Sequence, residues 1–289
     1  MSTPPRFLAR GHHAWLGLAW ILGCQVLLYA GVPFVEVFFT ALVWWGYIVF
    51  VDGIVRRLRG RSLLVDAFAE FRNIAVLSVP LWLVFEYYNF FLDNWHYIGL
   101  PANPRVRFLG YAVAFASILP ALIETADLIG GLSRKAAVLP PLRRQLDRGA
   151  KVIILIGVAM LVGPLVFPSR YVFAPVWIGF ILLCDPLNAR RGLPSFFADW
   201  ERGSLARAMP LLLGGYVCGL LWEFWNYWAG AKWIYTVPFF PEWRIFEMPV
   251  LGFLGFGPFA LEMYAMYLWT RGDVSYDFAV VRQDDGAGE

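Results

Sequence analysis

Four glutamates stand inside long apolar stretches of this sequence: Glu86, Glu124, Glu223 and Glu262. A charged carboxylate is costly inside a membrane, so such residues are rare there and are usually functional or tightly paired. Because an environment of low dielectric favours the neutral form of a carboxylic acid, these residues are candidate proton donors at neutral pH. The chemistry that they suggest is acid and base catalysis on an apolar substrate.

An asparagine follows two of these glutamates by three residues, giving the pairs Glu86–Asn89 and Glu223–Asn226. Residues three apart lie on the same face of a helix. We therefore expect each amide to hydrogen-bond its glutamate and to hold the carboxyl group in one rotamer. The structural alternative is that the buried Glu–Asn pairs only lock helices together.

Aromatic residues surround the second pair in the stretch "WEFWNYWAGAKWIYTVP", which covers residues 222–238. Ring faces attract positive charge, so these side chains could shelter a cationic intermediate. An interfacial belt of Trp and Tyr is the alternative for those at the outer ends of apolar stretches. The candidate substrate-contacting residues are Trp222, Trp225, Tyr227, Trp233, Tyr235 and, at the start of the last apolar stretch, Glu247.

The composition indicates an integral membrane protein. Of 289 residues, 60% are hydrophobic and only 16% are charged, a smaller charged fraction than in soluble domains. A membrane-crossing helix needs ~20 apolar residues. We predict an all-α membrane fold with eight transmembrane helices, at about residues 14–31, 35–51, 74–92, 108–129, 151–167, 171–184, 208–229 and 248–269.

The basic residues predict the orientation, because cytoplasmic loops collect Lys and Arg. With the N-terminus inside and eight crossings, nineteen Lys and Arg residues fall in inside segments and five in outside segments. We therefore expect a multi-pass protein of the cell inner membrane with cytoplasmic N- and C-termini. The net charge of +3 is then a consequence of topology, and no nucleic-acid partner is expected.

The chain also contains an internal repeat. "FEYYNFFLDNWHYIGLP" at residues 85–101 aligns with the stretch at 222–238, and the match extends in both directions, with Trp44 against Trp177 and Glu124 against Glu262. We predict two parallel four-helix repeats, at residues 12–131 and 148–271, related by a pseudo-twofold axis along the membrane normal. Residues 272–289 are expected to form a disordered cytoplasmic tail.

Several classes of enzyme are excluded by the motifs that are missing. Only three histidines exist, and no zinc-protease, phosphate-loop or dinucleotide-binding motif occurs. We therefore expect no metal and no cofactor. What remains suits the protonation of a carbon–carbon double bond by a buried acid, with cyclisation of the cation and loss of a proton to a second group. The partners would be a lipid-soluble isoprenoid substrate and membrane lipids.

The same residues resemble the integral-membrane lycopene cyclases of the fused or heterodimeric type, and the related terpenoid cyclases. The resemblance rests on Glu223, Asn226, the following W-x-Y (Trp233 and Tyr235) and a later Pro-x-x-x-Glu ending at Glu262, with Glu86, Asn89 and Glu124 in the first copy. It implies a cofactor-independent carotenoid or isoprenoid cyclase. Those cyclases show two adjacent glutamates where this chain has Leu261–Glu262.

Three other functions fit the sequence. A polyene hydratase would use the same acid, with water trapping the cation. A small proton-coupled transporter also combines parallel repeats with intramembrane carboxylates. A non-catalytic membrane scaffold would need the glutamates only for helix packing.

Overall fold

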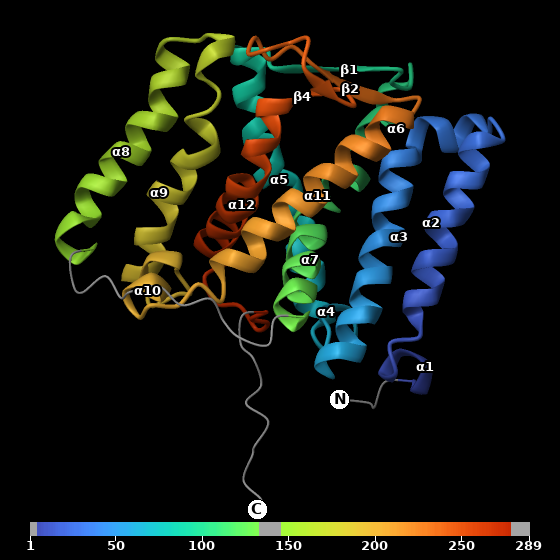
Figure 1. The fold of residues 1–289 in the computed structure, drawn as a ribbon, viewed down its shortest axis with the longest axis horizontal. Helices are drawn as coiled ribbons and strands as arrows, with labels where there is room; N and C mark the ends of the chain where they lie inside the picture. The colour runs from blue at the N-terminus through green and yellow to red at the C-terminus, as the bar shows by residue number, and fades with distance from the viewer. Residues whose placement is uncertain (1–4, 133–145, 279–289) are drawn as a thin grey trace, which may run out of the picture.

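The structure is a computed structural model that describes residues 5–132 and 146–278, and helices dominate it (Figure 1). The first stretch contains α1 (Arg6–Ala9), α2 (His13–Tyr29), α3 (Pro33–Arg59), α4 (Leu63–Asp66), α5 (Phe68–Leu92), β1 (Trp95–Ile98), α6 (Pro104–Phe115) and α7 (Ile118–Leu132). The second contains α8 (Leu146–Val166), η1 (Arg170–Val172), α9 (Val176–Arg190), α10 (Phe196–Glu201), α11 (Ala208–Trp228), β2 (Lys232–Tyr235), β3 (Arg244–Ile245), β4 (Met248–Pro249), η2 (Val250–Gly255) and α12 (Phe256–Arg271).

Seven helical segments among the described residues are long and apolar enough to cross a membrane, which supports a multi-pass helical membrane protein. They are Pro33–Arg59, Phe68–Leu92, Pro104–Leu132, Gly149–Val166, Arg170–Arg190, Ala208–Trp228 and Val250–Arg271. The remaining apolar helix, α2, has 17 residues. At 1.5 Å per residue it is ~26 Å long, so an eighth crossing at α2 stays a prediction.

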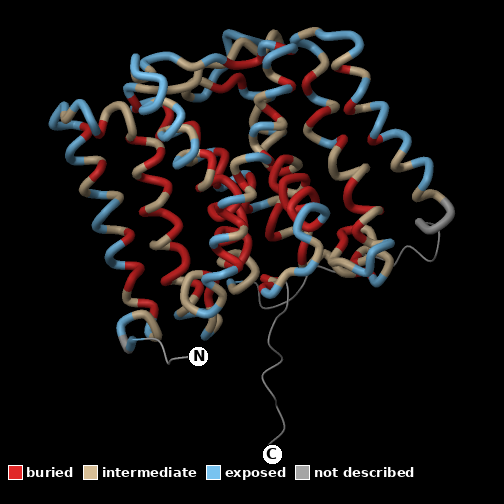
Figure 2. The backbone as a smooth tube through the Cα atoms, turned by 180° about the vertical axis from the view of Figure 1, so that it is seen from behind, coloured by how far each residue is buried: buried red, intermediate tan, exposed pale blue. Residues whose placement is uncertain are grey.

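Apolar side chains cover the outside of the helix bundle, and the buried residues lie in its middle (Figure 2). The outer helices α2 and α8 expose Leu16, Val26 and Leu155, each by 60% or more. A water-soluble protein seldom exposes so much apolar surface. In a bilayer the acyl chains cover it, so this surface agrees with the membrane class.

Glycines let the outer helices approach their neighbours closely. A Cβ atom added at Gly46 of α3 would lie 2.5 Å from the Trp20 ring of α2, and one added at Gly179 of α9 would lie 2.6 Å from the Leu161 side chain of α8. Small residues of this kind are the usual contact points of helices in membranes. Each outer helix is thereby held flat against the bundle.

Two of the membrane-crossing segments change their helical geometry part of the way along. The segment Pro104–Leu132 is interrupted between α6 and α7, where Ser78 of α5 donates to Phe115 O (2.5 Å) and accepts from Leu119 N (3.0 Å). The Ser78 side chain thus satisfies backbone groups that the interruption between α6 and α7 leaves without helical partners. In the other segment, Val250–Arg271, the 3₁₀ helix η2 precedes α12.

A short antiparallel sheet joins distant parts of the chain, which corrects the expectation of a purely α-helical fold. Strands β1 and β2 pair in the register Trp95↔Tyr235 and Tyr97↔Trp233. The W-x-Y motifs therefore form strands. From the sequence, their aromatic residues were expected at the outer ends of the apolar stretches. Alternate residues of a strand point to the same face, so each motif directs its Trp and Tyr together.

The C-terminal segment after α12 also differs from the prediction. Tyr276 and Phe278 are 9% and 1% exposed, and Arg59 of α3 donates to Phe278 O at 2.7 Å. A disordered tail beginning at residue 272 is therefore wrong for residues 272–278, because buried aromatic rings and arginine contacts hold this segment. The rest of the predicted tail, residues 279–289, lies outside the described residues.

Candidate functional site

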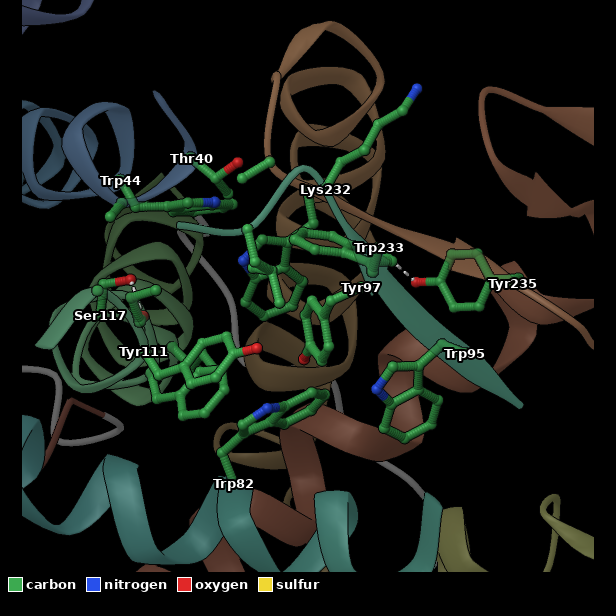
Figure 3. Close-up of a pocket in the computed structure, with 18 of the residues that line it drawn as sticks. Thr40, Trp44, Trp82, Trp95, Tyr97, Tyr111, Ser117, Lys232, Trp233 and Tyr235 are labelled. Carbon is green, nitrogen blue, oxygen red and sulfur yellow. Dashed lines mark hydrogen bonds between the residues drawn. The ribbon is translucent and has the colours of Figure 1, made fainter. Parts of the chain in front are cut away.

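A cavity of about 210 Å³ lies next to the β1–β2 sheet, among helices from both halves of the chain (Figure 3). Most of its wall is apolar or aromatic. Its wall includes Thr40, Trp44, Trp82, Trp95, Tyr97, Tyr111, Trp177, Trp222, Trp233, Tyr235 and Phe259, together with the basic residues Arg107 and Lys232.

The aromatic rings of the wall pack against one another. Trp82 stacks on Trp95 with ring centroids 5.9 Å apart, and Trp44 lies 5.1 Å from Trp222. Such contacts stabilise by about 0.5–1.5 kcal/mol beyond the burial of area. The wall is therefore a rigid set of ring faces and edges, suited to an apolar ligand or to a developing positive charge.

Glu86 and Glu223 lie directly behind this wall. The Tyr97 hydroxyl donates to Glu86 Oε1 at 2.5 Å, and the Tyr235 hydroxyl donates to Glu223 Oε1 at 2.8 Å. The Trp95 indole N–H donates to the same Glu86 oxygen at 3.2 Å. The Trp233 indole N–H donates to the Tyr235 hydroxyl oxygen at 2.9 Å and more weakly to Glu223 Oε1 at 3.4 Å. Each carboxyl group thus reaches the cavity through a tyrosine hydroxyl.

Both tyrosines remain protonated. Burial, reinforced by the adjacent glutamate, raises the pKa of Tyr97 and of Tyr235 well above the ordinary value of 10.0. A neutral phenol can donate one hydrogen bond and accept another. Each tyrosine thus stands between a carboxyl group and the cavity.

The asparagines have a different role from the one expected. Asn226 Nδ2 donates to Trp233 O at 2.8 Å and its Oδ1 accepts from Trp233 N at 2.9 Å. Asn89 makes the same pair of bonds with the backbone of Trp95, at 2.8 Å and 3.1 Å. The amides thus hold the strands and make no hydrogen bond to Glu86 or Glu223, because the strand backbone offers both a donor and an acceptor.

Glu124 and Glu262 are fully buried but lie outside the cavity wall. Glu124 lies near Asp52 of α3, and Glu262 lies near Phe180 and Cys184 of α9. No oxygen of either carboxyl group has a hydrogen-bond partner among the described residues. The structure therefore does not bring these two glutamates together with Glu86 and Glu223 around one cavity.

The six candidate substrate-contacting residues divide into two groups. Trp222, Trp233 and Tyr235 line the cavity. Trp225 lies behind the wall, with its ring centroid 4.9 Å from that of Trp44. Tyr227 is 42% exposed, and Glu247 forms an ion pair with Lys232 at 2.5 Å, so neither lines the cavity.

Sequence reasoning did not select several wall residues from the first half of the chain, among them Trp44, Trp82 and Tyr111. The repeat contained a signal for Trp44, whose aligned partner Trp177 also lines the cavity. For Tyr111 no such signal exists, because its place depends on how α6 packs beside the sheet. Tyr97 lies in the repeat at the position aligned with Tyr235, and the hydrogen bond to Glu86 is what places it in the site.

Within residues 5–132 and 146–278, no group of three or more His, Cys, Asp or Glu side chains is arranged to hold a metal ion. The polar side chains that line the described cavity carry hydroxyl, indole, amide, guanidinium and ammonium groups. No family model, no curated protein and no solved structure matches this chain.

Proposed function

We propose that this protein is a membrane enzyme that protonates and cyclises a lipid-soluble isoprenoid polyene without a cofactor. The observation that supports this most directly is the pair of carboxyl–tyrosine contacts, Glu86–Tyr97 and Glu223–Tyr235, at the wall of an aromatic cavity. An apolar substrate dissolved in the bilayer would meet this site without crossing water.

In the proposed reaction, Tyr235 adds its hydroxyl proton to a carbon–carbon double bond while the acid of Glu223 returns a proton to the phenol oxygen. One π bond breaks, one C–H bond forms, and the carbocation is attacked by a second double bond of the same chain. Glu86, through Tyr97, then accepts a proton from the ring carbon. Proton exchange with water between turnovers restores Glu223 to the acid and Glu86 to the carboxylate. No electron is gained or lost, so no redox partner is needed.

The size of the cavity limits what it can hold. At about 210 Å³ it is smaller than the ~300 Å³ at the lower end of ordinary ligand pockets. It would therefore take the reacting end of a long isoprenoid, while the remainder of the chain extends between helices into the lipid. A terminal ring closure is the reaction that this geometry favours.

We further propose that the two halves, residues 12–131 and 148–271, are parallel repeats of four crossings each. The register of β1 with β2 supports this, because it places the aligned motifs Trp95–Tyr97 and Trp233–Tyr235 antiparallel about a common centre. An axis through that centre runs into the cavity. With both termini on the cytoplasmic side of the inner membrane, the sheet would face outward.

The test is to express the protein in a bacterium that accumulates linear isoprenoids and to compare lipid extracts by chromatography and mass spectrometry. A product of unchanged mass and new retention time is expected. Glu223→Gln should abolish it, because Gln keeps the shape of the side chain but has no acidic proton. Glu242→Gln makes the same chemical change at an exposed residue and should leave the product yield unchanged.

Each alternative has its own result. A product heavier by one water would assign hydration to the same site. An unchanged extract from cells in which the folded protein is present in the membrane would contradict the enzyme assignment for these isoprenoids. Full yield from Glu223→Gln would remove Glu223 from the role of acid.

A further inference from the structure

Two hydrogen-bond donors of the cavity wall have no acceptor in the part of the chain that the structure describes. Trp44 and Thr40 lie one turn apart on α3, on the same helical face, and both line the cavity. Trp44 Nε1 and Thr40 Oγ1 are buried and have no hydrogen-bond partner among the described residues. The Trp44 side chain is 1% exposed, and its ring reaches from α3 toward the other labelled residues in Figure 3.

The orientation of this indole is fixed by its neighbours. Ring centroids of Trp222, Trp225 and Tyr47 lie 5.1, 4.9 and 5.1 Å from that of Trp44. The ring therefore cannot turn to find an acceptor elsewhere without repacking three aromatic side chains. Its N–H is held toward whatever occupies the cavity.

Three indoles elsewhere in the first half of the chain do have acceptors. Trp20 and Trp45 donate to backbone carbonyl oxygens at 2.8 and 3.1 Å, and Trp82 donates to Glu86 at 3.0 Å. Buried donors are almost always paired, because an unpaired one loses its hydration without compensation. Leaving Trp44 and Thr40 unpaired at the cavity therefore points to an acceptor that the ligand supplies.

The acceptor is expected to be uncharged. Both unpaired donors are neutral groups. Of the two basic residues that line the cavity, Lys232 already has Glu247 as its counterion, and Arg107 donates to the carbonyl oxygens of Pro101 (3.1 Å) and Ala102 (3.4 Å). Arg107 keeps its positive charge, but the ring neighbours of Trp44 are all aromatic, so an anionic headgroup beside Trp44 would be desolvated among neutral groups.

We propose that the isoprenoid bound here carries a neutral oxygen function, such as an alcohol or a carbonyl, which accepts hydrogen bonds from Trp44 and Thr40. This inference rests on the proposed function and narrows its substrate from a pure hydrocarbon to an oxygenated isoprenoid. The oxygen would fix the depth and direction of the chain in the cavity, so that one particular double bond faces Tyr97 and Tyr235.

The test is photoaffinity labelling of the purified full-length protein in phosphatidylcholine nanodiscs. Two C20 probes carry the diazirine at the same position: geranylgeraniol and the same tetraene without its hydroxyl group. The alcohol should label the wild-type protein about tenfold more strongly than the hydrocarbon, as expected for two added hydrogen bonds. Trp44→Phe should remove that preference, and the isosteric Thr40→Val should lower it about threefold.

Trp177→Phe is the matched control. It makes the same change at the aligned wall residue, whose indole nitrogen is not among the fully buried groups that lack a hydrogen-bond partner. It should lower labelling by both probes alike and keep their ratio. Elution profile and thermal unfolding midpoint of each variant show whether it is folded, and Thr40→Val tests the inference even if Trp44→Phe does not fold.

The outcomes separate this inference from the proposed function. Equal labelling of the wild type by both probes, or an unchanged preference in Trp44→Phe and Thr40→Val, overturns the oxygen-binding role and leaves the cyclase proposal standing. Labelling by neither probe overturns both, because the cavity then takes no isoprenoid. Preference without conversion of any substrate would support the binding site and contradict the enzyme.

Discussion

Glu86 and Glu223 occupy matching places but receive different numbers of hydrogen bonds. Trp82, Trp95 and Tyr97 all donate to Glu86, whereas only Trp233 and Tyr235 donate to Glu223, whose Oε2 has no partner among the described residues. The residue aligned with Trp82 is Gly219, which has no donor to offer. Because donors favour the ionised carboxylate, we propose Glu223 as the acid and Glu86 as the base of the proposed reaction.

This assignment predicts unequal effects of two matched substitutions at the residue scale. Tyr235→Phe interrupts the path from the acid and should lower kcat about 100-fold or more, within the range that general acid catalysis contributes. Tyr97→Phe interrupts only the path to the base. It should lower kcat about tenfold, because water or a neighbouring group can accept a proton from a reactive cation.

The measurement is steady-state turnover of the substrate found in lipid extracts, with the protein in nanodiscs. KM should change little in either variant, since the ring and its packing are kept. A larger loss in Tyr97→Phe than in Tyr235→Phe would reverse the roles of the two halves. Equal and small losses would mean that the tyrosines do not carry the proton.

At the scale of elements, the β1–β2 sheet is what turns separate helices into a cavity with a polar wall. Asn89 and Asn226 each fasten one strand to the helix before it, and Thr236 N donates across to Asn94 O at 2.8 Å. Without these contacts the strands would be an isolated two-stranded ribbon, which is only marginally stable. Helix-to-strand anchoring therefore positions the tyrosines.

Asn226→Ala should destabilise the protein by about 1–3 kcal/mol, because it leaves the buried N–H and C=O of Trp233 without partners. Chemical denaturation in detergent, followed by tryptophan fluorescence, measures this change. Asn73→Ala is the matched control on α5, since the Asn73 side chain makes no hydrogen bond with the described residues. Equal stability of the two variants would show that Asn226 does not anchor β2.

At the scale of the whole molecule, the segment after α12 ties the two halves together at the end opposite the sheet (Figure 1). The Tyr276 hydroxyl bonds Asp127 of α7, and Arg207, just before α11, bonds Asp277 at 2.7 Å. Burial raises the pKa of the Tyr276 hydroxyl, which therefore stays a donor. The sheet and this segment close the helix bundle at its two ends.

Phe278→Ala should cost about 3–5 kcal/mol, the usual loss for a fully buried phenylalanine. Phe90→Ala removes the same atoms from a side chain that is 81% exposed toward the lipid and should change stability little. The thermal unfolding midpoints of the two variants in the same detergent provide the comparison. A midpoint for Phe278→Ala equal to that of the wild type would mean that the segment does not hold the halves together.

The sequence by itself determined the coarse class of this protein and the identity of its unusual residues. Hydropathy is a property of local composition, so the membrane-crossing helices were predictable. The glutamates were conspicuous because they are polar residues within these apolar stretches. The places of Glu86 and Glu223 beside the W-x-Y motifs were also readable, because the motif recurs in the repeat.

Only the tertiary structure decided how those residues meet. The pairing of Trp95 with Tyr235, the separation of Glu124 from the cavity and the unpaired N–H of Trp44 depend on how segments far apart in the sequence pack together. The attachment of Asn226 to Trp233 depends on the strand that the chain forms after α11. A pattern records which side chains a segment carries. Tertiary packing decides which donor pairs with which acceptor, and the candidate chemistry of this protein depends on that pairing.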